Sequence, residues 1–194
     1  MKRNEAIEYF QKKIENEPTN ASAYHNLAVL LREGDTKAYR DLSRIALLAL
    51  PGSASLHSEM GLALLHDKET VLAREHFRAA IRIDGNYAPG HINLSAALAQ
   101  QGQYKLALSH IEVALSLDPD NAMVHRNAAK ILQELGRTRD SMNHNIRALE
   151  IQGGDAAVCH TLALQNISKG SREKGIEHYT AYRTFTGKKY NLKL

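Results

Sequence analysis

The chain has 194 residues, of which 43% are hydrophobic and 24% are charged, an ordinary composition for a folded soluble protein. It has no run of about 18 apolar residues, so the sequence predicts no membrane-spanning helix, and its polar start does not resemble a secretory signal. The single cysteine, Cys159, excludes an internal disulfide framework and is compatible with a reducing compartment, so we expect a cytoplasmic protein.

The net charge of +4 is concentrated near the C-terminus. Residues 169–194 contain seven Lys and Arg against two Glu, and the rest of the chain is close to neutral. A basic segment, here the tail at residues 186–194, can attract an acidic partner, nucleic acid or a membrane surface. The alternative is that the tail is only a solvated terminus.

Helix-ending residues return along the chain at a nearly constant interval. Successive members of one series are 33, 34, 34 and 34 residues apart: Pro18, Pro51, Gly85, Pro119 and Gly153. A second series lies near the middle of three of these intervals and after the last member of the first series: Gly34, Gly102, Gly136 and Gly170. Since Pro and Gly end helices, and apolar residues between them recur every three or four positions, each interval predicts a helix, a short turn and a second helix.

In chain order, the pattern predicts a half repeat followed by five full ones. Residues 1–20 hold a lone second helix. The full repeats are 21–52, 54–87, 88–121, 122–155 and 156–189. The turn of the repeat 21–52 is one residue short and its second helix is ambiguous. The last repeat carries Asn166 and Tyr182 where an apolar and a small residue are expected. Its end is either covered by its own aromatic residues or forms a contact with another subunit.

The repeat 88–121 has small or apolar residues at the positions where its two helices would touch. They are Leu94, Ser95, Leu98, Gly102, Tyr104, Ala107, Ile111, Ala114 and the closing Pro119. In these residues the chain resembles the tetratricopeptide repeat family. The resemblance implies an all-α fold, a right-handed α-solenoid superhelix of antiparallel helix pairs, because one repeat alone cannot bury its apolar face.

Ten histidines suggest a metal array, and the repeat provides another explanation for them. His57, His91 and His125 fall in first helices, and His76, His110, His144 and His178 fall in second helices, each series at the 34-residue interval. Equivalent residues of stacked repeats lie about 10 Å or more apart, too far to share one metal ion. With no HExxH or paired CxxC motif, we expect no metal and no cofactor.

No catalytic motif is present in the sequence. Cys159 and His160 are adjacent, and adjacent helical residues do not face each other. There is no GxSxG, GxGxxG or GxxxxGK[ST] segment. We therefore expect a protein that is not an enzyme.

The resemblance implies a concave groove, lined by the first helices, that binds an extended peptide or a helix of a partner protein. The sixth residue of each repeat would point into it: Asn26, Glu59, Asn93, Asn127 and Thr161. An asparagine amide can pair with any peptide backbone, although Asn could simply be frequent at this position. Ile92, Met123, Arg126 and Lys130 are further groove candidates. Arg126 and Lys130 share a helical face and could bind a carboxylate, or could be a solvated pair on the convex side.

These observations predict a non-catalytic adaptor or scaffold within a larger complex. The alternative is a structural subunit held through its ends and basic tail. A co-chaperone is disfavoured, because the positions of the family's carboxylate clamp read Ser58, Leu62, Asn93, Met123 and Asn127, with one match in five. Nucleic acid is also disfavoured, since aromatic residues are few and the basic excess lies in the tail. The sequence predicts no oligomeric state.

Overall fold

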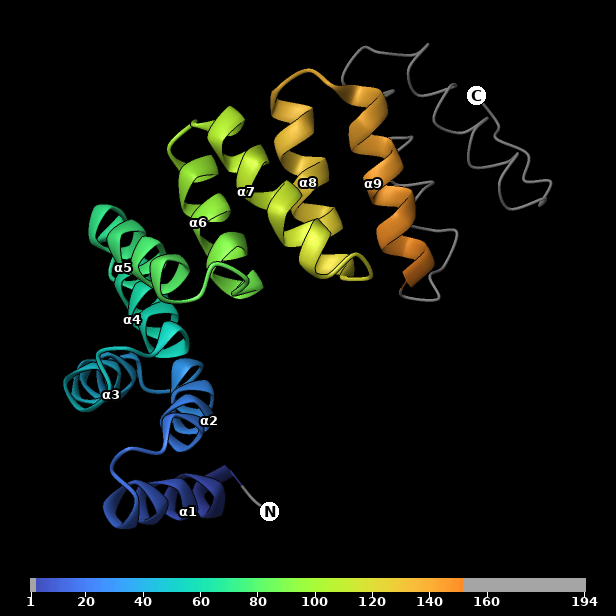
Figure 1. Cartoon of the computed structure of the whole chain (residues 1–194). Coiled ribbons are helices and arrows are strands. Elements are labelled where there is room, and N and C mark those ends of the chain that lie inside the picture. The colour runs from blue at the N-terminus through green and yellow to red at the C-terminus, as the bar shows by residue number, and fades with distance from the viewer. Residues whose placement is uncertain (1–2, 152–194) are drawn as a thin grey trace. The chain divides into compact units, whose positions relative to one another are not determined.

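The described part of the chain folds into successive helices joined by short turns (Figure 1). The computed structural model describes residues 3–151, in which it contains nine α-helices and no strand. They are α1 Arg3–Asn16, α2 Ala21–Arg32, α3 Thr36–Ala49, α4 Ala54–His66, α5 Thr70–Ile83, α6 Ala88–Gln100, α7 Tyr104–Leu117, α8 Ala122–Glu134 and α9 Thr138–Ile151. None of these helices is long and apolar enough to cross a membrane.

Two compact units divide the chain, Met1–Pro119 and Asp120–Leu194. Helices α1 to α7 belong to the first unit, and α8 and α9 to the second. The predicted repeat 156–189 and the basic tail 186–194, with Cys159 and Thr161, lie outside the described residues. The division of the chain into repeats stays a prediction.

Polar side chains define where several helices begin. Asn20, Asp35, Ser53 and Asn121 precede α2, α3, α4 and α8, and each accepts a hydrogen bond from a backbone N–H in the first turn. Such caps satisfy donors that a helix cannot pair internally. The ambiguous second helix of the repeat 21–52 is therefore present as α3, with Asp35 as its cap.

In three helix pairs, α4–α5, α6–α7 and α8–α9, the turn between the two helices contains one left-handed residue. Gly102 and Gly136 both have φ of +73°, and Lys68 has φ of +64° at the equivalent place. Glycine adopts this conformation without a steric penalty, whereas a residue with a Cβ does so at a cost. The 34-residue spacing of these three residues shows that the same turn recurs with different chemistry.

Small residues allow the two helices of a pair to approach closely. Ala107, Ile111 and Ala114 are completely buried in the α6–α7 pair. In the α4–α5 pair, a Cβ added to Gly61 would overlap the ring of Phe77. These are positions where the sequence predicts helix contacts.

In the first unit, the first helices form one continuous row. Helix α4 contacts both α2 and α6, while α3 packs against α2 and α4, and α5 packs against α4 and α6. Helix α1 packs against α2. The row of α2, α4 and α6 is the surface on which the sequence places its candidate groove.

Arginines in the second helices reach forward to the next pair. Arg40 Nη1 lies 2.6 Å from Asp67 Oδ2, at the C-terminal end of α4. Arg74 donates in the same way to Gln101, which follows α6. Arg3 of α1 donates to the carbonyl oxygen of Leu30, at 2.6 Å. All three connections join residues 27 positions apart, so neighbouring pairs are linked at their outer ends as well as through their apolar faces.

Candidate functional site

The candidate site in the first unit is the row formed by α2, α4 and α6. Three of the predicted groove residues lie on it at sixth positions: Asn26 is exposed, Asn93 is half-buried, and Glu59 is only 5% exposed. Ile92, another predicted groove residue on α6, is 7% exposed and therefore offers little surface to a ligand. The row thus presents polar groups of unequal accessibility.

Asn93 connects two helices of the row. Its Nδ2 donates a hydrogen bond of 2.9 Å to Oγ of Ser58 on α4, and Ser58 is itself buried. An asparagine amide offers two N–H donors and a carbonyl acceptor. One donor of Asn93 therefore links α6 to α4.

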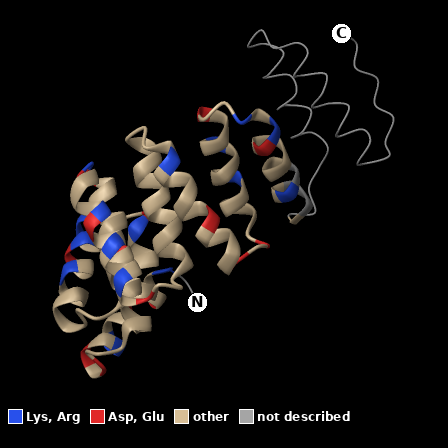
Figure 2. Ribbon diagram, turned by 45° about the horizontal axis from the view of Figure 1, so that its top comes forward, with Lys and Arg blue, Asp and Glu red and all other residues tan. Residues whose placement is uncertain are grey.

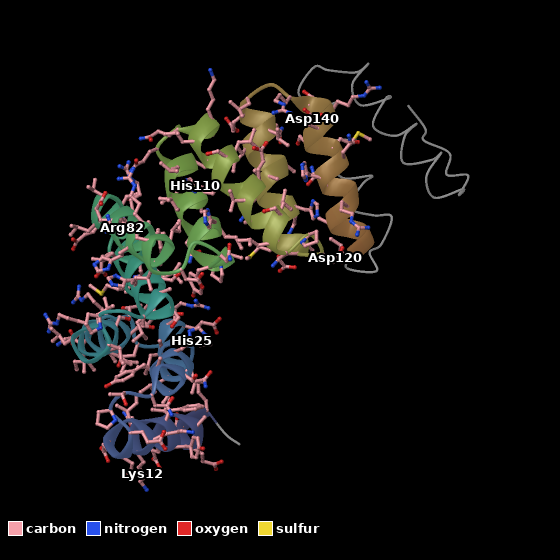
Figure 3. The ribbon with its side chains drawn as sticks, in the orientation of Figure 1. Lys12, His25, Arg82, His110, Asp120 and Asp140 are labelled. Atoms are coloured by element: carbon pink, nitrogen blue, oxygen red, sulfur yellow. The ribbon has the colours of Figure 1, made fainter. Side chains whose placement is uncertain are left out.

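Glu59 differs from the asparagines because its carboxylate is held inside the protein. Its Oε2 accepts a hydrogen bond of 2.8 Å from Tyr39 Oη, and Oε1 lies 3.0 Å from Nδ1 of His25. Burial, followed by the negative charge of Glu59, raises the pKa of Tyr39 above its usual range. His25 on α2 is labelled in Figure 3, and its side chain is 44% exposed, whereas that of Glu59 is 6% exposed. Glu59 therefore orders α2, α3 and α4 around the row.

In the second unit, helix α8 carries the remaining predicted groove residues that the structure describes. Met123 is 49% exposed, Arg126 and Lys130 are exposed, and Asn127 is half-buried. Arg126 and Lys130 lie one turn apart, so both can approach the same carboxylate. Basic and acidic residues are interspersed along the described helices of both units (Figure 2).

Histidines are paired across three helix pairs, which the sequence reasoning missed. The Nδ1 atoms of His57 and His76 are 3.1 Å apart, those of His91 and His110 are 3.1 Å apart, and those of His125 and His144 are 2.8 Å apart. The described members of one series lie in different helix pairs, but each of them lies beside a member of the other series. The signal was the 19-residue interval between the two series.

The paired histidines do not form a metal centre of the usual kind. Among residues 3–151, no group of three or more His, Cys, Asp or Glu side chains converges on a point where a metal ion could bind. Structural zinc requires four such ligands and catalytic zinc three. The chemistry of each pair is accordingly that of two imidazoles sharing one hydrogen bond.

Comparison with known proteins agrees with the helical repeats. Residues 98–164 match a family model described as tetratricopeptide repeat. A search of curated protein sequences found no match. The sequence-based resemblance to the tetratricopeptide repeat family is confirmed by this match together with the solved structures that share the fold.

Three of those structures illustrate the similarity. YrrB, described as "a TPR protein with an unusual peptide-binding site", is 21% identical, with a TM-score of 0.66 and coverage of 92% of each chain. MamA from Desulfovibrio magneticus RS-1, from residue 41 to its end, is 19% identical, with a TM-score of 0.66 and coverage of 84% of this chain and 93% of that one. A chain of the APC/C hetero-tetramer Cut9–Hcn1 is 17% identical, with a TM-score of 0.76. That match covers 96% of this chain and 38% of the other. The all-α fold of tetratricopeptide repeats is thus confirmed.

Proposed function

We propose that this chain is a non-catalytic cytoplasmic adaptor that binds an extended peptide or a helix of a partner protein, within a larger complex, along its row of first helices. The observation that supports this most directly is the continuous contact of α4 with α2 and α6, with exposed Asn26 and half-buried Asn93 on the row. YrrB, which shares the fold and has a peptide-binding site, supports the same interpretation.

The proposed contacts combine backbone recognition with charge. In the first unit, Asn93 would pair with the backbone of a bound segment, and in the second unit Asn127 would do the same, because their amides both donate and accept. Arg126 and Lys130 would bind an acidic side chain or a terminal carboxylate of a segment bound at α8. Met123, exposed at the start of α8, would contribute an adaptable apolar contact.

A substitution series tests the proposed groove. The partner is first identified by affinity purification and mass spectrometry, and a labelled peptide from it is then titrated by fluorescence anisotropy. Replacing both Asn93 and Asn127 by alanine should weaken binding about tenfold or more, because buried partner groups would be left unpaired.

Ser58→Ala is the matched control for this series. It removes the hydrogen bond between α4 and α6 but keeps the amide of Asn93. If Ser58→Ala weakens peptide binding as much as the double asparagine variant does, the role of Asn93 is to link α4 and α6 rather than to contact the peptide. Unaltered affinity in the double asparagine variant would rule out the groove.

The second candidate is a structural subunit held by its ends and its basic tail. It is favoured by the excess of seven Lys and Arg over two Glu, a net charge of +5, in residues 169–194. Removing residues 186–194 should then abolish assembly while the asparagine variants still assemble, measured by size-exclusion chromatography of the complex. The adaptor model predicts that the chain without residues 186–194 still assembles and that the asparagine variants do not.

A further inference from the structure

The paired histidines share one arrangement in three successive helix pairs. In each, a histidine in the first helix meets a histidine in the second helix through their Nδ1 atoms, with ring centroids 5.1–5.3 Å apart. His110, labelled in Figure 3, lies where α7 packs against α6. His91 and His125 are at most 9% exposed. These bonds therefore hold the two helices of a pair together at a largely buried point.

A backbone carbonyl determines which nitrogen carries the proton. Nε2 of His57 lies 3.1 Å from the carbonyl oxygen of Pro51, and Nε2 of His91 lies 3.2 Å from that of Gly85. A carbonyl oxygen only accepts, so Nε2 of each first-helix histidine carries the proton and donates. In the neutral ring, Nδ1 is then the acceptor. It follows that His76 and His110 donate from their own Nδ1–H.

In the pairs His57–His76 and His91–His110, this polarity limits the number of protons that the two rings can accept. One added proton enters at Nε2 of the second-helix histidine and leaves both hydrogen bonds in place. A second added proton can enter only at Nδ1 of the first-helix histidine. That atom is already the acceptor of the shared bond, so two N–H groups and two positive charges would then face each other.

We propose that the paired histidines are proton-responsive contacts. Each pair of imidazoles holds its two helices together when it has bound no added proton or one, and the two helices separate when a second proton binds. The opening would separate a first helix from its second helix, and through the carbonyl of Pro51 or Gly85 it would also release the preceding turn. Because each repeat contacts mainly its neighbours, the three pairs act as three local and similar devices.

Two of the second-helix histidines resist protonation in the folded chain. Burial, and next the charge of His57, lowers the pKa of His76. Burial lowers the pKa of His110, as do the charges of His91 and of Arg78 on α5, although Glu75 of the same helix pairs with Arg78 at 2.7 Å. The folded chain therefore binds fewer protons than the unfolded chain below the ordinary pKa of about 6.5, so stability is lost as pH falls through about 6.5.

Urea unfolding of the full chain between about pH 8 and pH 5, followed by circular dichroism, tests this proposal. The variants are His76→Gln, His110→Gln and His144→Gln, singly and combined. A glutamine amide can donate to a neutral imidazole nitrogen and accept from a charged one, so it keeps a bond in both states. His66→Gln, at an exposed histidine outside the pairs, is the matched control.

For the unaltered chain, we expect unfolding to take up as much as one additional proton for each pair, so the unfolding constant rises up to about tenfold per pH unit for each pair. Each single variant should remove one such contribution, the triple variant should remove all three, and His66→Gln should remove none. An equal pH slope in the unaltered chain and the triple variant would overturn the proposal. So would nitrogen NMR showing both histidines of a pair charged at about pH 5.5 in the folded chain.

Discussion

The α4–α5 pair and the α6–α7 pair have the same backbone plan and different chemistry at corresponding positions. In both, a helix of 13 residues is followed by one of 14. Where the helices approach most closely, the first pair places Gly61 against the ring of Phe77. The second places Ser95, whose Oγ donates a hydrogen bond of 2.8 Å to the carbonyl oxygen of Ala107. Close approach thus requires a small residue but not a particular one.

The α8–α9 pair extends this comparison within the second unit. There Ser141 of the second helix donates at 2.7 Å to the carbonyl oxygen of Ala129 in the first helix. Ser141 lies 34 residues after Ala107, and Ala129 lies 34 residues after Ser95. The same two positions therefore form the hydrogen bond in both pairs, but the serine donor is in the first helix of one pair and in the second helix of the other. These positions therefore bring the two helices of each pair into contact, although the atoms that form the contact differ from pair to pair.

The largest expected effect comes from enlarging the residue at the closest approach. Gly61→Leu should destabilise the chain by about 3 kcal/mol, because its side chain would displace the fully buried Phe77 ring. Thermal and urea unfolding would measure the loss. Gly52→Leu is the control, since a Cβ there meets no atom within 4 Å. Equal midpoints for the two variants would contradict the helix contact at Gly61.

A smaller effect is expected from removing the hydrogen bond in the other pair. Ser95→Ala should cost about 1 kcal/mol, the net contribution of a buried hydrogen bond. The control is Ser109→Ala, whose exposed hydroxyl bonds only within its own helix, to Leu106. If urea midpoints of Ser95→Ala and Ser109→Ala coincide, the bond from Ser95 does not stabilise the pair.

The smallest effect concerns the left-handed turn. Lys68→Gly should stabilise the chain by about 0.5 kcal/mol, because relief of the left-handed strain is partly offset by the larger entropy of glycine in the unfolded chain. Gly102→Lys should destabilise by about as much, measured by the same unfolding experiment. If Lys68→Gly is instead less stable, the lysine side chain stabilises the folded chain by more than the left-handed backbone conformation destabilises it.

The helix pairs could be predicted from the sequence because their signals are local. Pro51 and Pro119 mark helix ends, and Ala107, Ile111 and Ala114 recur at helical spacing within one element. Such patterns need no knowledge of which helices meet. The fold class followed from the 34-residue repetition of these patterns.

The contacts of the site could not be predicted in the same way, because they depend on how helices pack. The bond from Asn93 to Ser58 joins residues of different repeats, and the pairing of His91 with His110 joins two helices of one repeat. Comparing equivalent positions showed only that members of one histidine series are separated. Whether Asn93, Asn127, Arg126 and Lys130 bind a partner stays a prediction.

The forward-reaching arginines make residues 54–87 a module that can be copied. This segment carries Asp67, which receives Arg40, and Arg74, which reaches the residue 27 positions later. If the segment were duplicated in tandem, Arg74 of the first copy would meet the equivalent of Asp67 in the second. Each new junction would then contain the ion pair that the chain already forms once, so the protein could lengthen by internal duplication without a new linking contact.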